Sequence, residues 1–126
     1  MPTILIVDDS RFMRQWLRRI IQQQKAYTII EASNGNAAVQ LYKDNHPDLV
    51  LMDMIMPQMT GLVALQAIID YDPKAKVMMC SSMGTKQHVR EALHIGAKDF
   101  VVKPFFDALP NGFINFFITQ VINFFH

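Results

Sequence analysis

The chain is poor in cysteine, in net charge and in long apolar runs. Its single cysteine, Cys80, permits no internal disulfide, so nothing suggests a secreted, disulfide-bonded scaffold. A net charge of +1 at neutral pH gives no general case for binding nucleic acid or an anionic membrane. Polar residues interrupt even the longest charge-free stretch, 108–125, whereas a membrane span needs about 20 mostly apolar residues. The first predicted strand begins within three residues of the N-terminus, which leaves no room for a signal peptide. We therefore expect a cytoplasmic protein without membrane insertion.

The length and hydrophobic content of the chain fit one compact domain. The sequence has 126 residues, of which 51% are hydrophobic and 18% charged, and this is enough to bury a core. Hydrophobic stretches predict five strands, at 3–7, 27–31, 48–52, 76–81 and 98–102. Helical patterns alternate with them, at 10–24, 35–46, 62–69, 85–95 and about 110–125. Ser10 is a good N-cap for the first of these helices, and His46-Pro47 should end the second, because the residue before proline disfavours helix. This alternation predicts an α/β fold with a parallel sheet covered on both faces.

Charged residues stand where the predicted strands end. Asp8 and Asp9 follow the first strand, Asp53 follows the third, and Lys103 follows the fifth. In an open parallel sheet, ligands bind outside the carboxyl ends of the strands, so these groups should converge there. Acids before a helix can have a purely local role, but their joint occurrence at three strand ends favours a shared site. Three converging carboxylates need a cation, and a few hard oxygen ligands suit Mg²⁺. The pattern predicts phosphoryl chemistry on an aspartate.

The same residues carry a family resemblance. From residue 3 to about residue 105 the chain resembles the receiver domains of response regulators, especially the single-domain chemotaxis regulators. The matching segments are 4–10, 53–57 together with Gly61, 79–84 and 96–105. The resemblance implies a doubly wound, five-stranded parallel sheet of the flavodoxin-like (βα)5 type, with strand order 2-1-3-4-5. We expect residues 1–126 to form one such receiver domain.

The resemblance also implies roles for the residues at the strand ends. Asp53 matches the phosphoacceptor, and Asp9 matches a direct Mg²⁺ ligand. Asp8 matches the acidic neighbour that often acts through water, and the backbone carbonyl of Ile55 falls where a third protein ligand is supplied. Lys103 would offer a point positive charge to the phosphoryl oxygens. The implied cofactor is Mg²⁺, which would offset charge during transfer.

Two further residues match the switch of this family. Ser81 offers a hydroxyl that can bond a phosphoryl oxygen once the phosphate is present. Phe100 matches the aromatic switch residue, whose ring would move inward when Ser81 moves toward the phosphate. Many relatives have tyrosine there, and phenylalanine keeps the ring without the hydroxyl.

The implied function is two-component signal transduction, with a chemotaxis-like output. The domain would accept a phosphoryl group on Asp53 from a histidine kinase and signal to a protein partner by changing its surface. It would be a signalling phosphoacceptor rather than a conventional enzyme, with self-catalysed phosphotransfer and autodephosphorylation. One alternative is a phosphohydrolase with an aspartyl nucleophile, but such enzymes usually carry a second acid where Ile55 stands. The other is an assembly module that acts through its last helix.

The predicted last helix, about 110–125, departs from the family pattern. Its apolar residues cover about half of a helical projection, wider than the usual core stripe of about 100°. Phe116 falls among the polar residues of the opposite side. The helix can be an apolar but buried element, an altered tail, or a contact surface for a partner or a homodimer.

The first predicted helix carries a basic face. It holds four arginines, namely Arg11, Arg14, Arg18 and Arg19. They can form a solvated face or dock a phosphorelay partner, and the sequence leaves both interpretations open.

Overall fold

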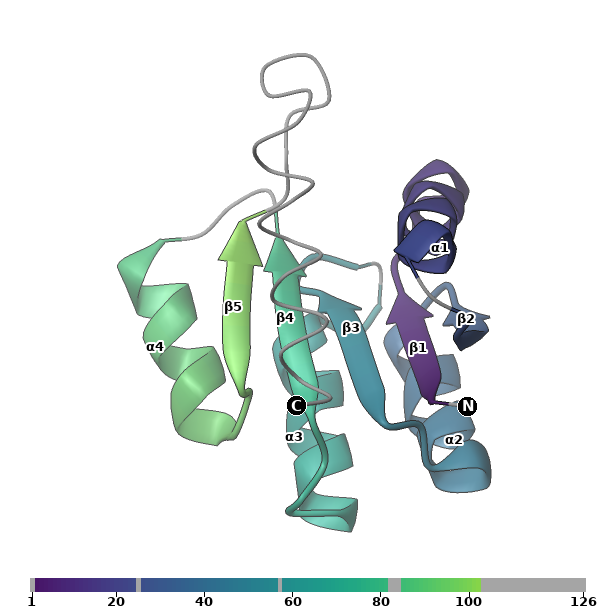
Figure 1. Ribbon diagram of the computed structural model, residues 1–126. Coiled ribbons are helices and arrows are strands. Elements are labelled where there is room, and N and C mark those ends of the chain that lie inside the picture. The colour runs from purple at the N-terminus through teal and green to yellow at the C-terminus, as the bar shows by residue number, and fades with distance from the viewer. Residues whose placement is uncertain (1, 25, 57, 82–84, 103–126) are drawn as a thin grey trace.

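The described residues form an alternating series of strands and helices. The computed structural model describes residues 2–24, 26–56, 58–81 and 85–102. The strands are β1 (Thr3–Val7), β2 (Thr28–Ala32), β3 (Leu49–Asp53), β4 (Val77–Ser81) and β5 (Asp99–Val102). The helices are α1 (Arg11–Gln24), α2 (Gly35–Asn45), α3 (Gly61–Tyr71) and α4 (Lys86–Ile95), as Figure 1 shows.

The five strands form a parallel sheet in the order β2-β1-β3-β4-β5. This confirms the expected doubly wound topology and its strand order. The order places β1 and β3 side by side although 41 residues separate the end of β1 from the start of β3 (8–48). Because all strands run in the same direction, their carboxyl ends share one edge of the sheet.

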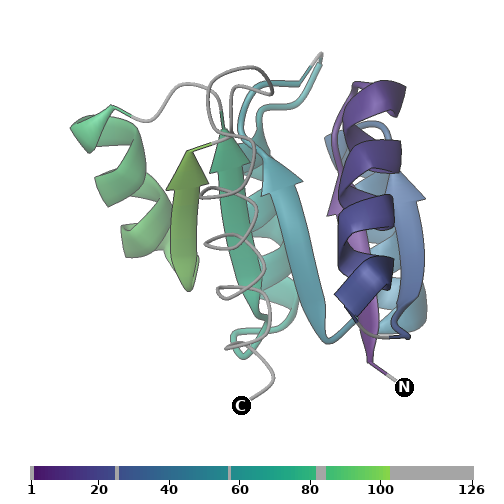
Figure 2. The same cartoon turned by 45° about the horizontal axis from the view of Figure 1, so that its top comes forward.

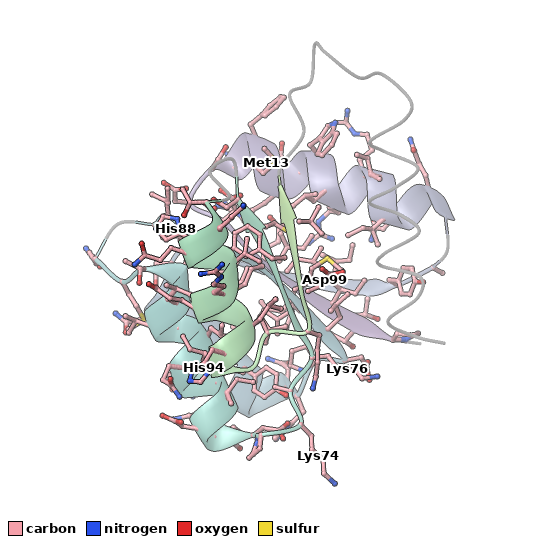
Figure 3. All side chains as sticks on the ribbon, turned by 90° about the vertical axis from the view of Figure 1, so that its left-hand side faces the viewer. Met13, Lys74, Lys76, His88, His94 and Asp99 are labelled. Atoms are coloured by element: carbon pink, nitrogen blue, oxygen red, sulfur yellow. The ribbon has the colours of Figure 1, made fainter. Side chains whose placement is uncertain are left out.

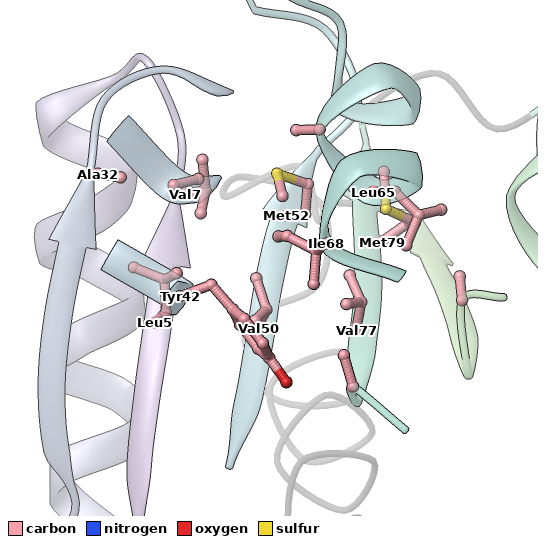
Figure 4. Close-up of a cluster of buried hydrophobic side chains, with 14 of the residues drawn as sticks. Leu5, Val7, Ala32, Tyr42, Val50, Met52, Leu65, Ile68, Val77 and Met79 are labelled. Atoms are coloured by element: carbon pink, nitrogen blue, oxygen red, sulfur yellow. The ribbon is translucent and has the colours of Figure 1, made fainter. Parts of the chain in front are cut away.

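Helices cover both faces of the sheet. Helix α1 lies over one face, and α2, α3 and α4 pack on the other (Figure 1 and Figure 2). Neighbouring residues of a strand point to opposite faces, so each strand feeds both cores. In β1, Ile4 and Ile6 join the core under α1, whereas Leu5 and Val7 join the core on the other side. Figure 4 shows this second core, where the strand residues Met52 and Met79 share a cluster with Leu65 and Ile68 of α3.

The helix ends agree with the turn residues of the sequence. The side chains of Asn34, Thr60 and Thr85 each accept a hydrogen bond from the backbone three residues later, which caps α2, α3 and α4. Helix α2 ends at Asn45, and its C-cap residue His46, which has φ 46°, stands directly before Pro47. The prediction that this helix stops at the His46-Pro47 pair is therefore confirmed.

Strand boundaries differ from the predicted ones by a residue. Strand β2 begins at Thr28 and β4 begins at Val77, one residue later than expected. Strand β3 runs from Leu49 and includes Asp53 as its last residue. Asp53 is therefore held by the sheet, opposite Cys80 of β4, instead of following the strand.

The predicted last helix and Lys103 lie outside the described residues. None of the four described helices combines the length and the hydropathy that crossing a membrane would require.

Candidate functional site at the carboxyl edge of the sheet

Three aspartates meet at the carboxyl edge of the sheet. One carboxylate oxygen from each of Asp8, Asp9 and Asp53 lies within 4.8 Å of the other two. Asp8 and Asp53 are 2% and 7% exposed, whereas Asp9 is exposed to solvent. The convergence predicted from the strand ends is thus present for the three aspartates, and the cluster opens to solvent on the side of Asp9.

Backbone hydrogen bonds fix the turn that carries two of these acids. The Asp8 amide donates to the carbonyl of Ala32, which extends the pairing of β1 with β2 by one step (3.1 Å). The Ser10 amide then donates to Oδ1 of Asp8 (2.9 Å), and Oγ of Ser10 accepts from the Met13 amide (3.2 Å). The predicted cap at Ser10 is confirmed, because its side chain satisfies a free amide of the first helical turn. The acids therefore sit just before a helix N-terminus, where negative charge is favoured.

A glycine holds the third acid in place from below. The Gly61 amide donates to the Met54 carbonyl (2.7 Å), which folds the loop after β3 back onto that strand. A Cβ at Gly61 would overlap the carbonyl oxygen of Asp53 and come within 2.7 Å of the Met54 Cα. Only glycine permits this close approach of two backbone segments. Gly61 was identified from the family motif alone, and the structure supplies the steric reason for it.

The loop after Asp53 presents Ile55 beside the acids. The Ile55 amide lies 3.5 Å from Oδ1 of Asp53, at the outer limit of a hydrogen bond. The Ile55 side chain is 53% exposed. Since this position carries an apolar side chain, only its backbone can offer a polar group to a ligand.

Ser81 and Phe100 lie on neighbouring strands and on the same face of the sheet. Ser81 ends β4 and is 1% exposed, and it pairs in register with Val102 of β5. Phe100 pairs with Met79, two residues before Ser81, and packs against the core between the sheet and helices α2 to α4. Because side chains two residues apart share a face, the Ser81 hydroxyl and the Phe100 ring occupy adjacent positions on it.

Two of the four arginines of α1 turn toward the sheet. Arg14 Nε donates to Oε1 of Glu31 (3.0 Å), and the Arg14 side chain is only 15% exposed. Arg18 binds Oε2 of the same carboxylate (2.7 Å). Arg11 and Arg19 are exposed, so the interpretation as a solvated or docking face remains open for these two only. Sequence reasoning missed Glu31, whose one signal was a carboxylate within an otherwise apolar strand.

The histidines of α4 lie apart from this site. Figure 3 shows His88 and His94 on different turns of α4. Among residues 2–24, 26–56, 58–81 and 85–102, the three aspartates are the group of His, Cys, Asp and Glu side chains arranged to hold a metal ion.

Comparison with known proteins identifies the family. The model of the response regulator receiver domain matches residues 4–109. The chemotaxis protein CheY of Thermotoga maritima is 49% identical over 102 residues, which cover 81% of this chain and 85% of that protein. CheY of Bacillus subtilis is 48% identical over 102 residues, with the same two coverages. A crystal structure of a CheX-CheY-BeF3-Mg complex from Borrelia burgdorferi superposes with a TM-score of 0.88 at 35% identity, covering 99% of this chain and 90% of that one. The chain therefore belongs to the receiver domains of response regulators, the signalling domains of two-component systems, and is similar to the CheY proteins of chemotaxis.

Proposed function

We propose that Asp53 accepts a phosphoryl group from a histidine kinase in a Mg²⁺-dependent reaction, and that the domain then signals to a protein partner as chemotaxis regulators do. The observation that carries this proposal is the approach of three carboxylates, from the ends of β1 and β3, within 4.8 Å of one another. Two of the three are almost fully buried, so their mutual repulsion is poorly screened by water.

The donor set fits a magnesium ion. Hard oxygen ligands in small number, with room for water on an open side, are what Mg²⁺ prefers. Asp9, Asp53 and the carbonyl of Ile55 would hold the ion, with Asp8 acting through water. When bound there, Mg²⁺ would supply positive charge that offsets the negative charge of a loose transition state.

The chain itself supplies the nucleophile and its orientation. A carboxylate oxygen of Asp53 attacks the phosphorus of a phosphohistidine, and an oxygen–phosphorus bond forms while the phosphorus–nitrogen bond breaks. The product is an acyl phosphate on Asp53 and a free imidazole on the kinase. The sheet register and Gly61 hold the Asp53 backbone during this step. Lys103, directly after β5, would add a positive charge to the phosphoryl oxygens.

The signal would pass through Ser81 and Phe100. Ser81 would bond a phosphoryl oxygen, and its movement would free space for the Phe100 ring on the same face of the sheet. Phe100 is half-buried against the core between the sheet and helices α2 to α4. This position supports the coupling, since the residue borders both the core and the solvent.

Exposed apolar side chains beside the acids support a protein as the phosphoryl donor. Phe12, in the first turn of α1, is 67% exposed, and Ile55 is also largely exposed. Apolar surface exposed beside a reactive group is suited to contact with a protein partner. The Borrelia burgdorferi relative was crystallised in a complex with CheX, which supports a protein partner for this chain too. We place this activity in the cytoplasm.

The proposed receiver domain spans residues 1–126 and includes the apolar segment of about 110–125. We propose that this segment forms the last helix, covers part of the sheet, and offers its surplus apolar surface to a second copy. The family match ends at residue 109, so the segment is the least conventional part of the chain.

Intact-protein mass after incubation with acetyl phosphate tests the acceptor. With Mg²⁺ the wild type should gain one phosphoryl group, and without Mg²⁺ the gain should fall sharply. Asp53→Asn should gain none, because an amide cannot replace the attacking carboxylate. Labelling of that variant at the wild-type rate would refute the assignment. Multiple turnover of a phosphate ester by the wild type would instead favour the phosphohydrolase alternative.

A further inference from the structure

The structure assigns to Arg14 of α1 the role of a positioning residue for the metal site, acting on the Asp8–Asp9 turn rather than on the ligand. This inference rests on the proposed Mg²⁺ site. Its starting point is a hydrogen bond from Arg14 Nη1 to the backbone carbonyl oxygen of Asp8, at 2.7 Å. That carbonyl belongs to the peptide that joins Asp8 to Asp9, so Arg14 fixes the plane from which the Asp9 side chain departs.

The guanidinium of Arg14 is itself held in place. Its Nε donates to Oε1 of Glu31 at 3.0 Å, while Nη1 reaches the Asp8 carbonyl. A planar guanidinium with two fixed partners has little freedom, and burial to 15% exposure reduces that freedom further. Glu31 lies in β2 next to Ala32, whose carbonyl accepts from the Asp8 amide. Both backbone groups of Asp8 are thus anchored by the end of β2, one directly and one through Arg14.

Positioning matters here because the acids repel one another. Asp9 is exposed, and its carboxylate gains from swinging into water, away from Asp8 and Asp53. If the backbone already holds the Asp9 side chain close to its like-charged neighbours, cation binding does not have to supply the free energy of bringing the carboxylates together. Loss of the Arg14 hydrogen bond would let the peptide rotate and the three oxygens spread apart.

Arg18 provides a matched comparison within the same helix. It also donates to Glu31, at 2.9 Å, but its second partner is the carbonyl of Ile29, inside β2. The two arginines therefore carry the same charge and bind the same counter-ion, Glu31. Of the two, Arg14 is the one that contacts the Asp8–Asp9 turn. Replacing either by alanine removes one positive charge and one ion pair with Glu31.

The sign of the effect separates positioning from simple electrostatics. Removing a positive charge near a cation site should strengthen Mg²⁺ binding if charge alone matters. Removing a positioning residue should weaken it. Titration calorimetry with MgCl₂ on the full chain should give an Arg14→Ala dissociation constant about three to ten times that of wild type, the range expected for one net hydrogen bond. Arg18→Ala should bind Mg²⁺ as wild type or slightly tighter, with a comparable fall in the unfolding midpoint.

Two further variants keep the test decisive if Arg14→Ala folds poorly. Arg14→Lys retains the charge but not the two-pronged geometry, and its Mg²⁺ affinity should fall between wild type and Arg14→Ala. Glu31→Gln frees the guanidinium without touching the turn and should weaken Mg²⁺ binding by a smaller factor than Arg14→Ala. If wild type binds Mg²⁺ and Arg14→Ala binds it as tightly as Arg18→Ala, the positioning role is wrong while the proposed site stands. If wild type itself does not bind Mg²⁺, both are wrong.

Discussion

The two edges of the sheet differ in how their polar side chains interact. At the carboxyl edge three carboxylates lie within 4.8 Å of one another, an arrangement that costs stability unless a cation joins them. At the amino edge, Tyr42 of α2 donates its hydroxyl to Oδ2 of Asp72, directly after α3, at 2.7 Å. The carboxyl edge brings like charges together, whereas the amino edge pairs a buried hydroxyl with a carboxylate. The groups suited to bind a ligand and the groups that stabilise the fold therefore lie at opposite ends of one small domain.

Aromatic rings reinforce the amino edge. Tyr42 meets Tyr71 edge to face, with ring centroids 6.3 Å apart, and His46 lies 5.9 Å from Tyr71. Lys43 Nζ lies 5.4 Å from the centroid of the Tyr71 ring. These contacts join the ends of α2 and α3, so the helices that back the acidic site are tied together at the edge remote from it.

The largest expected effect comes from the backbone beneath the acidic edge. Gly61→Ala should lower the free energy of unfolding by about 2–4 kcal/mol, because the new methyl group overlaps the Asp53 carbonyl and neither backbone segment can move aside easily. Chemical denaturation measures this loss. Gly35→Ala is the matched control, since its methyl group would meet the flexible Met59 Sδ at 2.6 Å, and its loss should be clearly smaller. Equal losses would show that the backbone contact at Gly61 is not special.

Removing one negative charge from the acidic edge should stabilise the protein, in contrast to the loss expected for Gly61→Ala. Asp53→Asn keeps the shape of the side chain and relieves repulsion, so without Mg²⁺ it should raise the free energy of unfolding by about 1–2 kcal/mol. Denaturation without Mg²⁺ and with a saturating concentration of Mg²⁺ measures the stability of both proteins in both conditions. Mg²⁺ should stabilise wild type more than the variant. If Asp53→Asn is less stable than metal-free wild type, repulsion among the three carboxylates does not destabilise the carboxyl edge.

Tyr42→Phe probes the amino edge and should cost about 1 kcal/mol, the net value of one hydrogen bond. The effect should depend on pH in a defined way. The hydrogen bond from Tyr42 lowers the pKa of Asp72, so this part of the stability is present above the unfolded pKa of about 3.9 and is lost as pH falls through the lower folded pKa. Burial and the bond to Asp72 raise the pKa of Tyr42, so this part is present below the unfolded pKa of about 10 and is lost as pH rises above it.

The difference in unfolding free energy between wild type and Tyr42→Phe should therefore be flat between about pH 4 and pH 10 and shrink on both sides. Tyr71→Phe, which keeps the ring and whose hydroxyl is not the one bonded to Asp72, serves as the control. A Tyr42→Phe variant with wild-type stability throughout would remove the contrast between the two edges.

The smallest effect is expected on self-association through the predicted last helix. Phe116→Glu should raise the dissociation constant of a dimer without changing folding or phosphorylation, because it places a charge in a stretch of sequence, 108–125, that has none. Sedimentation velocity over a range of concentrations measures it. Thr119→Glu adds the same charge without removing a ring and should have a weaker effect. A wild type that remains monomeric at high concentration would leave the segment as an ordinary core element.

The sequence predicts local features of this molecule well and pairings between distant elements poorly. The alternation of strands and helices and the stop at His46-Pro47 follow from local patterns, and the structure confirms them. The convergence of Asp8, Asp9 and Asp53 could be predicted because the carboxyl ends of parallel strands share one edge, whichever strands are neighbours. The strand order 2-1-3-4-5 came from the family resemblance, since periodicity does not say which strands are neighbours.

The partners of Glu31 could not be predicted in the same way. Arg14 is 17 residues from Glu31, and helical periodicity shows only that it borders the apolar face of α1. Whether a border residue faces water or an adjacent strand depends on how α1 lies across the sheet. The bond between Tyr42 and Asp72, 30 residues apart, is hidden from the sequence for the same reason.

The position of Trp16 has a practical consequence for all of these measurements. The chain has one tryptophan, and it packs partly buried against the core under α1, two residues after Arg14 on the same helix. Any loosening of α1 changes how much water reaches the indole, and the wavelength of its emission follows that polarity. Trp16 is thus an intrinsic fluorescent probe of how closely α1 packs against the sheet. Its emission can be followed in real time on an unlabelled sample.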